Sequence, residues 1–202
     1  MNTGSPPRLF LIGPPAAGKT TLKDFARRRF EAVGARPLVC GIEEAQRVLR
    51  PPDKADASYY YDDVGALILL DRDRQIIEAT ELLASWCREA KEQGFICEFA
   101  HPKLQTALLR YFSDLLAASL IVYVTAPHGV RVLRNSNRTT LRMPSEVLQK
   151  IGDDFSSSDI AALEAMDASV SVLETNGTIL QAEGLLASQI RNKWKDLFDV
   201  VV

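Results

Sequence analysis

The sequence predicts a single α/β domain in which helices cover a parallel β-sheet. Short apolar runs alternate along the chain with amphipathic segments of helical period, the pattern of repeated strand–helix–strand units. The 202 residues are enough for one domain with a substantial core. Nearly half of the residues are apolar and a quarter are charged, which is typical of a soluble globular protein.

Five apolar runs have the length and composition of buried strands. Each is bounded by glycine, proline, polar or charged residues, which end a strand or favour a turn. Strands that are apolar along their whole length indicate a sheet with both faces covered. The expected strands lie at 8–12, 37–42, 95–99, 120–125 and 170–174.

Helical segments separate these runs, and several have clear start or stop signals. Gly34 and Gly94 are placed to end two of the helices, tandem prolines follow another, and Pro102 begins a fourth. The stretch 50–63 is expected to be irregular, and loops of that length are usually functional or mobile. The expected helices span 20–33, 43–49, 72–93, 102–117, 128–137, 144–151, 158–166 and 178–195.

Bulk properties exclude some classes of function. A formal net charge of −2 argues against a general nucleic-acid coat protein, although it leaves room for a local basic groove. Residues 1–7 contain no apolar core of a signal peptide, and no apolar run approaches the roughly 20 residues that span a bilayer. A cytoplasmic location without membrane contact is therefore expected.

The cysteines and histidines show no metal-binding spacing. Cys40, Cys87 and Cys97 form no CxxC pair, and their odd number in apolar surroundings predicts buried free thiols in a reducing compartment. His101 and His128 are far apart in the sequence, so a zinc site is not expected.

A glycine-containing motif follows the first expected strand and opens the next helix. It fits G-x-x-x-x-G-K-[ST] at every fixed position. Backbone N–H groups of such a loop surround phosphate oxygens, the lysine reaches the β- and γ-phosphates, and the hydroxyl holds magnesium. The motif predicts binding of ATP or GTP with Mg²⁺ by Gly13, Pro14, Pro15, Ala16, Ala17, Gly18, Lys19, Thr20 and the adjoining Thr21.

The motif alone does not separate GTPases, ATP-driven motors and kinases. The nearest match to a guanine-reading Asn-Lys-x-Asp string, at 192–196, has one residue too many and lies in the last helix. Arg131, Arg134 and Arg138 share one helix face after the fourth strand, and Arg142 follows. Arginines at that sheet edge favour a kinase, because phosphoryl transfer needs cations around the moving group. A solvated basic helix face is the alternative.

Three further features accompany the phosphate-binding motif. Glu44-x-x-Arg47 follows the second strand, the third strand ends in Glu98, and Arg138 and Arg142 precede a helix that begins with Pro144. Together the four features resemble the small P-loop kinases, which include polynucleotide kinases, nucleotide kinases, zeta-type toxins and related antibiotic phosphotransferases. Many polynucleotide-kinase-like proteins have Asp where this chain has Glu44.

The resemblance covers residues 8 to about 180 and implies both fold and donor. It implies a three-layer α/β/α P-loop kinase fold with a five-stranded parallel sheet of order 2-3-1-4-5, an arginine-bearing helical lid at about 128–152, and ATP as donor. Arg134 is then expected on the nucleotide, and Arg138 and Arg142 on the transferring phosphoryl group. Asn176, in the turn after the fifth strand, would lie against the adenine. A plain turn is the other interpretation of that site.

Two acids are candidates for the proton transfer that a kinase needs. Glu44 and Glu98 both lie at carboxyl ends of strands, where a carboxylate can orient the acceptor hydroxyl and accept its proton. Glu98 can instead hold Mg²⁺ with Thr20, through water. Glu43 competes with Glu44 for the role of base. The resemblance favours Glu44 as base and Arg47 as a substrate contact.

The expected loop at 50–63 occupies the place where related kinases insert a substrate-binding segment. Tyr60 can stack on a base and Asp62 can read its edge, although a tyrosine cluster more often packs a loop down. His101 is a further candidate substrate contact, with helix capping as the alternative.

The sequence therefore predicts an ATP-dependent kinase acting on a hydroxyl of a nucleotide, nucleoside or nucleic acid, either a 5′ end or a hydroxymethylated base. The alternatives are a P-loop NTPase or regulatory switch without phosphate transfer, and a kinase of a non-nucleotide small molecule. Neither the acceptor nor the oligomeric state has a signature in the sequence.

Overall fold

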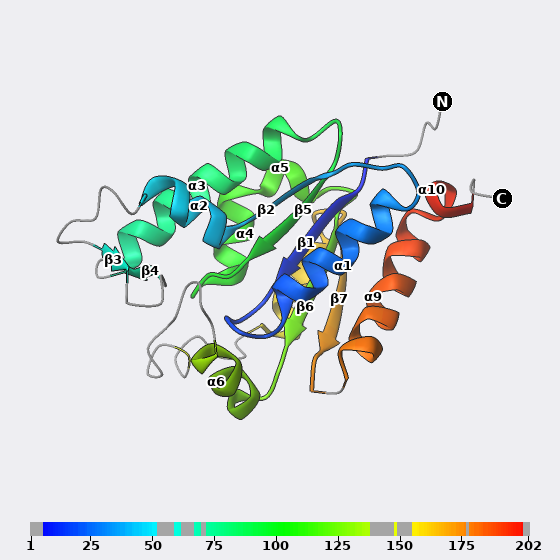
Figure 1. The fold of residues 1–202 in the computed structure, drawn as a ribbon. Coiled ribbons are helices and arrows are strands. Elements are labelled where there is room, and N and C mark those ends of the chain that lie inside the picture. Colours follow the sequence, from blue (N-terminus) through cyan, green and yellow to red (C-terminus); the bar gives the residue numbers. More distant parts are fainter. Residues whose placement is uncertain are drawn as a thin grey trace.

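The central element is a five-stranded parallel sheet. A computed structural model describes residues 6–51, 59–61, 67–69, 72–137, 148, 155–176 and 178–199. The sheet has the order β2-β5-β1-β6-β7 (Figure 1). The predicted order 2-3-1-4-5 is confirmed, because two additional short strands change only the numbering. The strands are β1 (Arg8–Ile12), β2 (Leu38–Gly41), β5 (Phe95–Phe99), β6 (Leu120–Thr125) and β7 (Ser169–Glu174).

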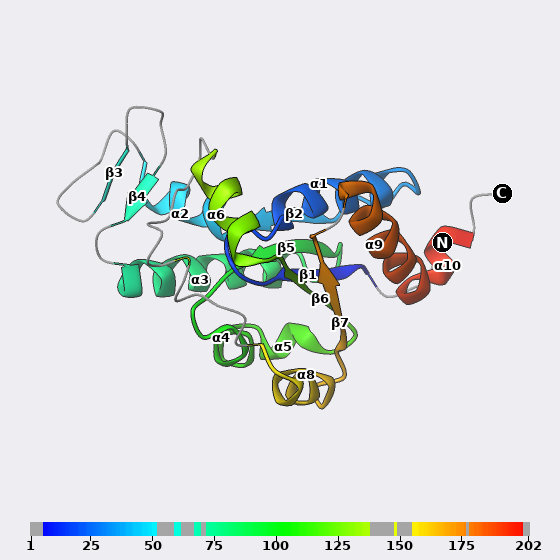
Figure 2. The same cartoon turned by 90° about the horizontal axis from the view of Figure 1, so that it is seen from below.

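Helices cover both faces of this sheet, as Figure 2 shows. Side chains of β1 alternate between the faces: Leu9 and Leu11 pack in one apolar cluster, and Phe10 and Ile12 in the other. On the first face lie α1 (Lys19–Glu31) and α9 (Ile179–Lys193), with α10 (Lys195–Asp199) following α9. On the second lie α3 (Arg72–Glu89), α4 (Leu104–Tyr111), α5 (Ser113–Leu116) and α8 (Ser157–Glu164).

Two helices stand at the carboxyl edge of the sheet. α2 (Ile42–Leu49) continues directly from β2, and α6 (His128–Ser136) follows β6. A buried polar contact fixes α2 on α3: Arg50 donates to Gln46 Oε1 at 2.6 Å and to Glu78 Oε2 at 2.7 Å, and Gln46 donates to the carbonyl of Gln75 at 3.1 Å. These contacts hold the second half of α2 against α3, while its start continues directly from β2.

The structure corrects three expected elements. The stretch 50–63 is not irregular throughout, since β3 (Tyr59–Tyr61) pairs antiparallel with β4 (Leu67–Leu69). The helix expected at 102–117 is two helices, separated at Phe112, whose buried ring packs edge-on against Phe10 and Phe99. The last helix ends at Lys193, where Trp194 leaves helical geometry.

Two further expectations concern the helix at 144–151 and membrane-spanning segments. Of the helix expected at 144–151, only Leu148 is described, and it is buried. Among the helices that the structure describes, none is long and apolar enough to cross a membrane.

Candidate active site

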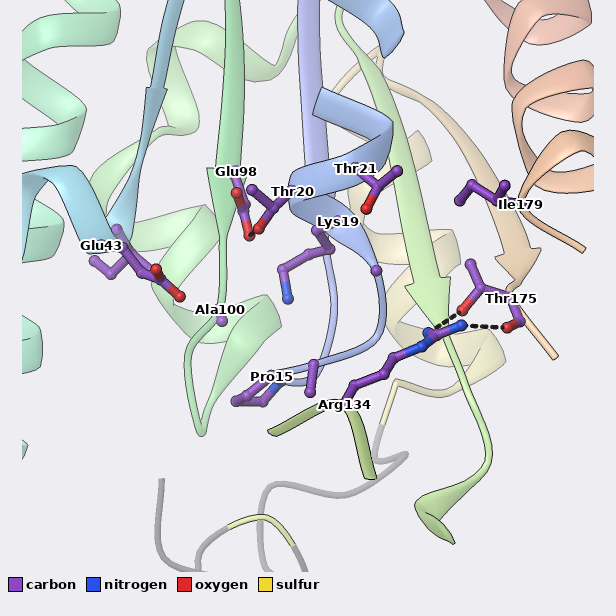
Figure 3. A pocket seen from close by; sticks show the side chains of 13 residues that line it. Pro15, Lys19, Thr20, Thr21, Glu43, Glu98, Ala100, Arg134, Thr175 and Ile179 are labelled. Carbon is purple, nitrogen blue, oxygen red and sulfur yellow. Dashed lines mark hydrogen bonds between the residues drawn. The ribbon is translucent and has the colours of Figure 1, made fainter. Parts of the chain in front are cut away.

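A cavity of about 410 Å³ opens at the carboxyl edge of the sheet, where the phosphate-binding loop, α2, β5 and α6 meet (Figure 3). Parallel α/β sheets place ligands at this edge. The cavity is lined by Pro15, Ala16, Gly18, Lys19, Thr20, Thr21, Ile42, Glu43, Glu98, Ala100, Arg134, Thr175 and Ile179. It thus joins residues from both halves of the sequence.

The loop conformation explains why glycine stands at its two ends. Gly13 has φ +136°, and a Cβ there would lie 2.1 Å from the carbonyl oxygen of Val124. Gly18 has φ +100°, and a Cβ would lie 3.3 Å from Nη1 of Arg134. The close backbone contact excludes any side chain at Gly13, and the positive φ strains any larger residue at Gly18. The loop therefore has the tight backbone turn that lets N–H groups face a phosphate.

Lys19 lies at the mouth of this loop. Its Nζ donates to the carbonyl oxygens of Gly13 at 3.0 Å and Pro14 at 2.7 Å. The side chain is largely buried and its ammonium points into the cavity (Figure 3). A cation held by backbone carbonyls at this point is placed to exchange them for phosphate oxygens.

Thr20 and Glu98 meet as the expected oxygen ligands of a metal ion. Thr20 Oγ1 donates to Glu98 Oε1 at 2.9 Å, and Glu98 is 7% exposed at the end of β5. Mg²⁺ prefers hard oxygen ligands and usually takes only one or two from the protein. A hydroxyl at the start of α1 and a buried carboxylate at the end of β5 fit that preference.

Lys23, one helical turn after Lys19, is a functional candidate that the sequence analysis missed. Its Nζ contacts Glu44 Oε1 at 2.5 Å and Glu98 Oε2 at 3.2 Å, and its side chain is 5% exposed. Burial lowers the pKa of Lys23, but the charges and hydrogen bonds of Glu98 and Glu44 outweigh burial and raise it above its ordinary value. Lys23 therefore remains a cation that fixes both carboxylates.

The two acids of α2 occupy different places. Glu43 lines the cavity and points into it (Figure 3), whereas Glu44 turns back to Lys23. A Cβ on Gly41 would lie 2.6 Å from Glu44 Oε2 and 3.2 Å from Lys23 Nζ. Glycine before α2 thus makes room for the ion pair. The Glu43 side chain therefore faces the cavity, whereas the Glu44 carboxylate is held by Lys23 and does not line the cavity.

Arg134 forms the opposite wall with Thr175. Its guanidinium donates to Thr175 Oγ1 and to the Thr175 carbonyl, both at 3.0 Å, and to the Ala17 carbonyl at 3.2 Å. Arg131, on the same helix, is buried instead, with Nη1 3.4 Å from the carbonyl oxygen of Leu148. Only Arg134 of these two reaches the cavity, and Arg138 and Arg142 lie outside the described residues.

The remaining expected contacts lie away from the cavity or outside the described chain. Asn176 is exposed, and Thr175 lines the cavity in its place. Arg47 is exposed on α2, and Tyr60 is 47% exposed on β3. Asp62 is outside the described residues.

His101 makes a local backbone contact in the turn before α4, but α4 has no side-chain cap. Its Nδ1 accepts from the backbone N–H of Lys103 at 3.0 Å, just before α4, and its ring stacks on Phe99. It lines a smaller cavity of about 220 Å³ beside Gly13 and Pro14.

Thr175→Val is expected to destabilise the protein by about 1–3 kcal/mol, because it removes a buried hydroxyl that several groups share. Thr175 Oγ1 lies 2.6 Å from the Ala17 carbonyl and 3.1 Å from the Thr125 carbonyl, and it accepts from Arg134. Urea denaturation measures the change, with Thr106→Val at an exposed position as control. Equal stability of the two variants would show that Thr175 does not hold this wall of the cavity.

Comparisons with known proteins agree with this geometry at the level of fold. No family model and no curated protein matches the chain. The solved structures that do match include a shikimate kinase from Acinetobacter baumannii in complex with shikimate, at 16% identity and TM-score 0.54, covering 98% of this chain and 96% of that one.

Two other matches are of similar quality. A sugar kinase from Janibacter is 17% identical with TM-score 0.53 and 95% coverage of both chains. A gluconokinase from Sinorhizobium meliloti is 12% identical with TM-score 0.51, covering 98% of this chain and 99% of that one. At these identities the likeness shows the fold, which is that of the small P-loop kinases, as the motif resemblance predicted.

Proposed function

We propose that the protein is a Mg²⁺- and ATP-dependent kinase that transfers the γ-phosphoryl group to a hydroxyl of a small molecule. The observation that carries the proposal is the convergence of Lys19, the Thr20–Glu98 pair and Glu43 on one cavity. A volume of about 410 Å³ is within the range of small-ligand sites. The structural neighbours named for sugars, shikimate and gluconate support a small-molecule acceptor more than a nucleic-acid end.

The donor would lie along the phosphate-binding loop. Backbone N–H groups between Gly13 and Lys19 and the N-terminus of α1 would hold its phosphates, and Lys19 would leave the loop carbonyls for the β- and γ-phosphate oxygens. Thr20 and Glu98 would hold Mg²⁺, which when bound would supply positive charge to stabilise the transferred phosphoryl group. Arg134 would border the nucleotide side of the cavity.

The acceptor hydroxyl would approach from the side of α2. Glu43 lines the cavity there and would orient the hydroxyl and accept its proton. Glu44 is a weaker candidate because its carboxylate contacts Lys23 Nζ at 2.5 Å and is not among the residues that line the cavity. This assignment replaces Glu44, the base that the resemblance favoured, with Glu43, which the sequence analysis named as its competitor.

Release of ADP that depends on an acceptor tests the proposal. The purified protein with Mg²⁺ and ATP should release ADP faster when a pool of sugars, polyols, hydroxy acids and nucleosides is added, and single compounds then identify the acceptor. ATP consumption that no pool accelerates would favour the NTPase alternative. Acceleration by an oligonucleotide alone would favour the nucleic-acid alternative.

Glu43→Gln is expected to lower the acceptor-dependent rate by roughly a hundredfold, the contribution typical of a general base. Glu44→Gln is the matched control, one residue away on the same helix, and should retain most of the rate. Steady-state rates with the identified acceptor, together with ATP binding by calorimetry, make the comparison. A large loss in Glu44→Gln and none in Glu43→Gln would restore Glu44 as the base.

A further inference from the structure

All three cysteines of the chain meet at one point behind the active-site edge. Cys40 lies on β2, Cys87 on α3 and Cys97 on β5, and their sulfur atoms lie within 4.8 Å of one another. The Cys40 and Cys87 sulfurs are 3.8 Å apart, and Cys40 and Cys97 are directly paired in the parallel register. Residues from two strands and a helix thus form a three-sulfur cluster.

The spacing of these sulfurs fits a shared ligand. Three sulfurs at about 2.3 Å from one ion, in a trigonal plane, would be roughly 4.0 Å apart. The observed separations require only small side-chain adjustments to reach that arrangement. A disulfide would use two of the sulfurs and leave the third without a role, whereas a metal ion would use all three.

Metal binding at this cluster would need thiolates, because the thiolate is the form that binds soft metals. Each sulfur that binds would give up its proton, so metal binding would release protons.

A cavity lies beside one member of the cluster. It has a volume of about 440 Å³ and is lined by Cys40 and, among others, by Val39, Glu44, Trp86 and Gln93. Cys40 is 2% exposed, and it is the member of the cluster that lines this cavity.

We propose that Cys40, Cys87 and Cys97 form a binding site for one soft monovalent metal ion of the Cu(I) class. Thiolates select soft ions, and Cu(I) can be coordinated by two or three sulfur ligands. Zn²⁺ in protein sites almost always takes four ligands, and among the described residues no fourth histidine, cysteine or carboxylate joins the cluster. The ion would link β2, β5 and α3. Two of its ligands, Cys40 and Cys97, directly precede Gly41 and Glu98 in the sequence.

The test is a titration of the reduced protein with Cu(I) under anaerobic conditions, against a chromophoric Cu(I) chelator and without ATP. One ion per chain should bind, raising the thermal midpoint, and Cu K-edge X-ray absorption should show sulfur neighbours alone. Loss of a residue that only supports a metal ligand lowers metal affinity by about 10–100-fold. Each Cys→Ala variant loses a ligand itself, so it should bind Cu(I) at least about a hundredfold more weakly.

Val122→Ala, a buried truncation on β6, is the control for loss of core packing and should retain the ion. Failure of the wild type to compete with the chelator, equal retention by the cysteine variants, or absorption showing four ligands including nitrogen or oxygen would each overturn the proposal. Because binding is measured without nucleotide, these outcomes are independent of the proposed kinase activity.

Discussion

Replacement of Lys19 by alanine is expected to lower phosphoryl transfer by roughly a hundred- to a thousandfold, the range found when a preorganised charge-stabilising donor is removed. Lys19 is the cation nearest the loop that would hold the β- and γ-phosphates, and its ammonium already points into the cavity. No other lysine among the residues lining that cavity in the described chain can replace it.

The fold of this variant should survive. Lys19 donates to two carbonyls of the phosphate-binding loop, which are not core groups, so the thermal midpoint should change little. Rates and thermal midpoints should be measured together, with Lys195→Ala at an exposed position as control. A folded Lys19→Ala protein with wild-type turnover would refute the location of the nucleotide site.

Glu98→Gln is expected to lower turnover by about a hundredfold or more, because it keeps the size of the side chain and removes the charge that serves the metal. Glu98 accepts from Thr20 and pairs with Lys23, so its carboxylate is fixed at both oxygens. The Mg²⁺ concentration that gives half-maximal rate should rise, while ATP still binds through the loop backbone and Lys19. Unchanged magnesium dependence would remove Glu98 from the metal site.

Lys23→Met tests the Glu98 carboxylate through Oε2, the oxygen that contacts Lys23. Lys23 acts as a positioning residue, and its loss should cost roughly 10–100-fold in rate with a shift in magnesium dependence. Truncation also leaves Glu44 and Glu98 without their shared cation, which costs stability. Lys23→Arg keeps the cation and should therefore retain part of the rate and part of the stability that Lys23→Met loses. A rate loss that follows stability alone, with unaltered magnesium dependence, would assign Lys23 a structural role only.

Local signals explain what the sequence predicted correctly. The phosphate-binding motif and the apolar runs are patterns of residues close together in the sequence. The strands of the sheet and the turn at Gly13 and Gly18 could therefore be predicted from short segments. Sheet order came from the family resemblance rather than from those signals. The position of Glu98 next to Thr20 followed because parallel strands end at one edge.

The parts that were missed depend on contacts between distant segments. Lys23 was not singled out from the sequence, because its partner Glu44 lies 21 residues away and becomes a neighbour only through folding. The break at Phe112 reflects ring packing against Phe10 and Phe99, which overrides helix propensity. Convergence of the cysteines likewise has no signature in their spacing.

The destination of the γ-phosphoryl group tests the central claim most directly. The reaction is run in ¹⁸O-water with ATP, Mg²⁺ and the accelerating acceptor, and the phosphorylated products are analysed by mass spectrometry. Transfer to an organic hydroxyl predicts an acceptor phosphate that contains no oxygen from the solvent, formed by the wild type and lost in Lys19→Ala. Inorganic phosphate carrying one ¹⁸O atom as the sole product would show hydrolysis and contradict the account.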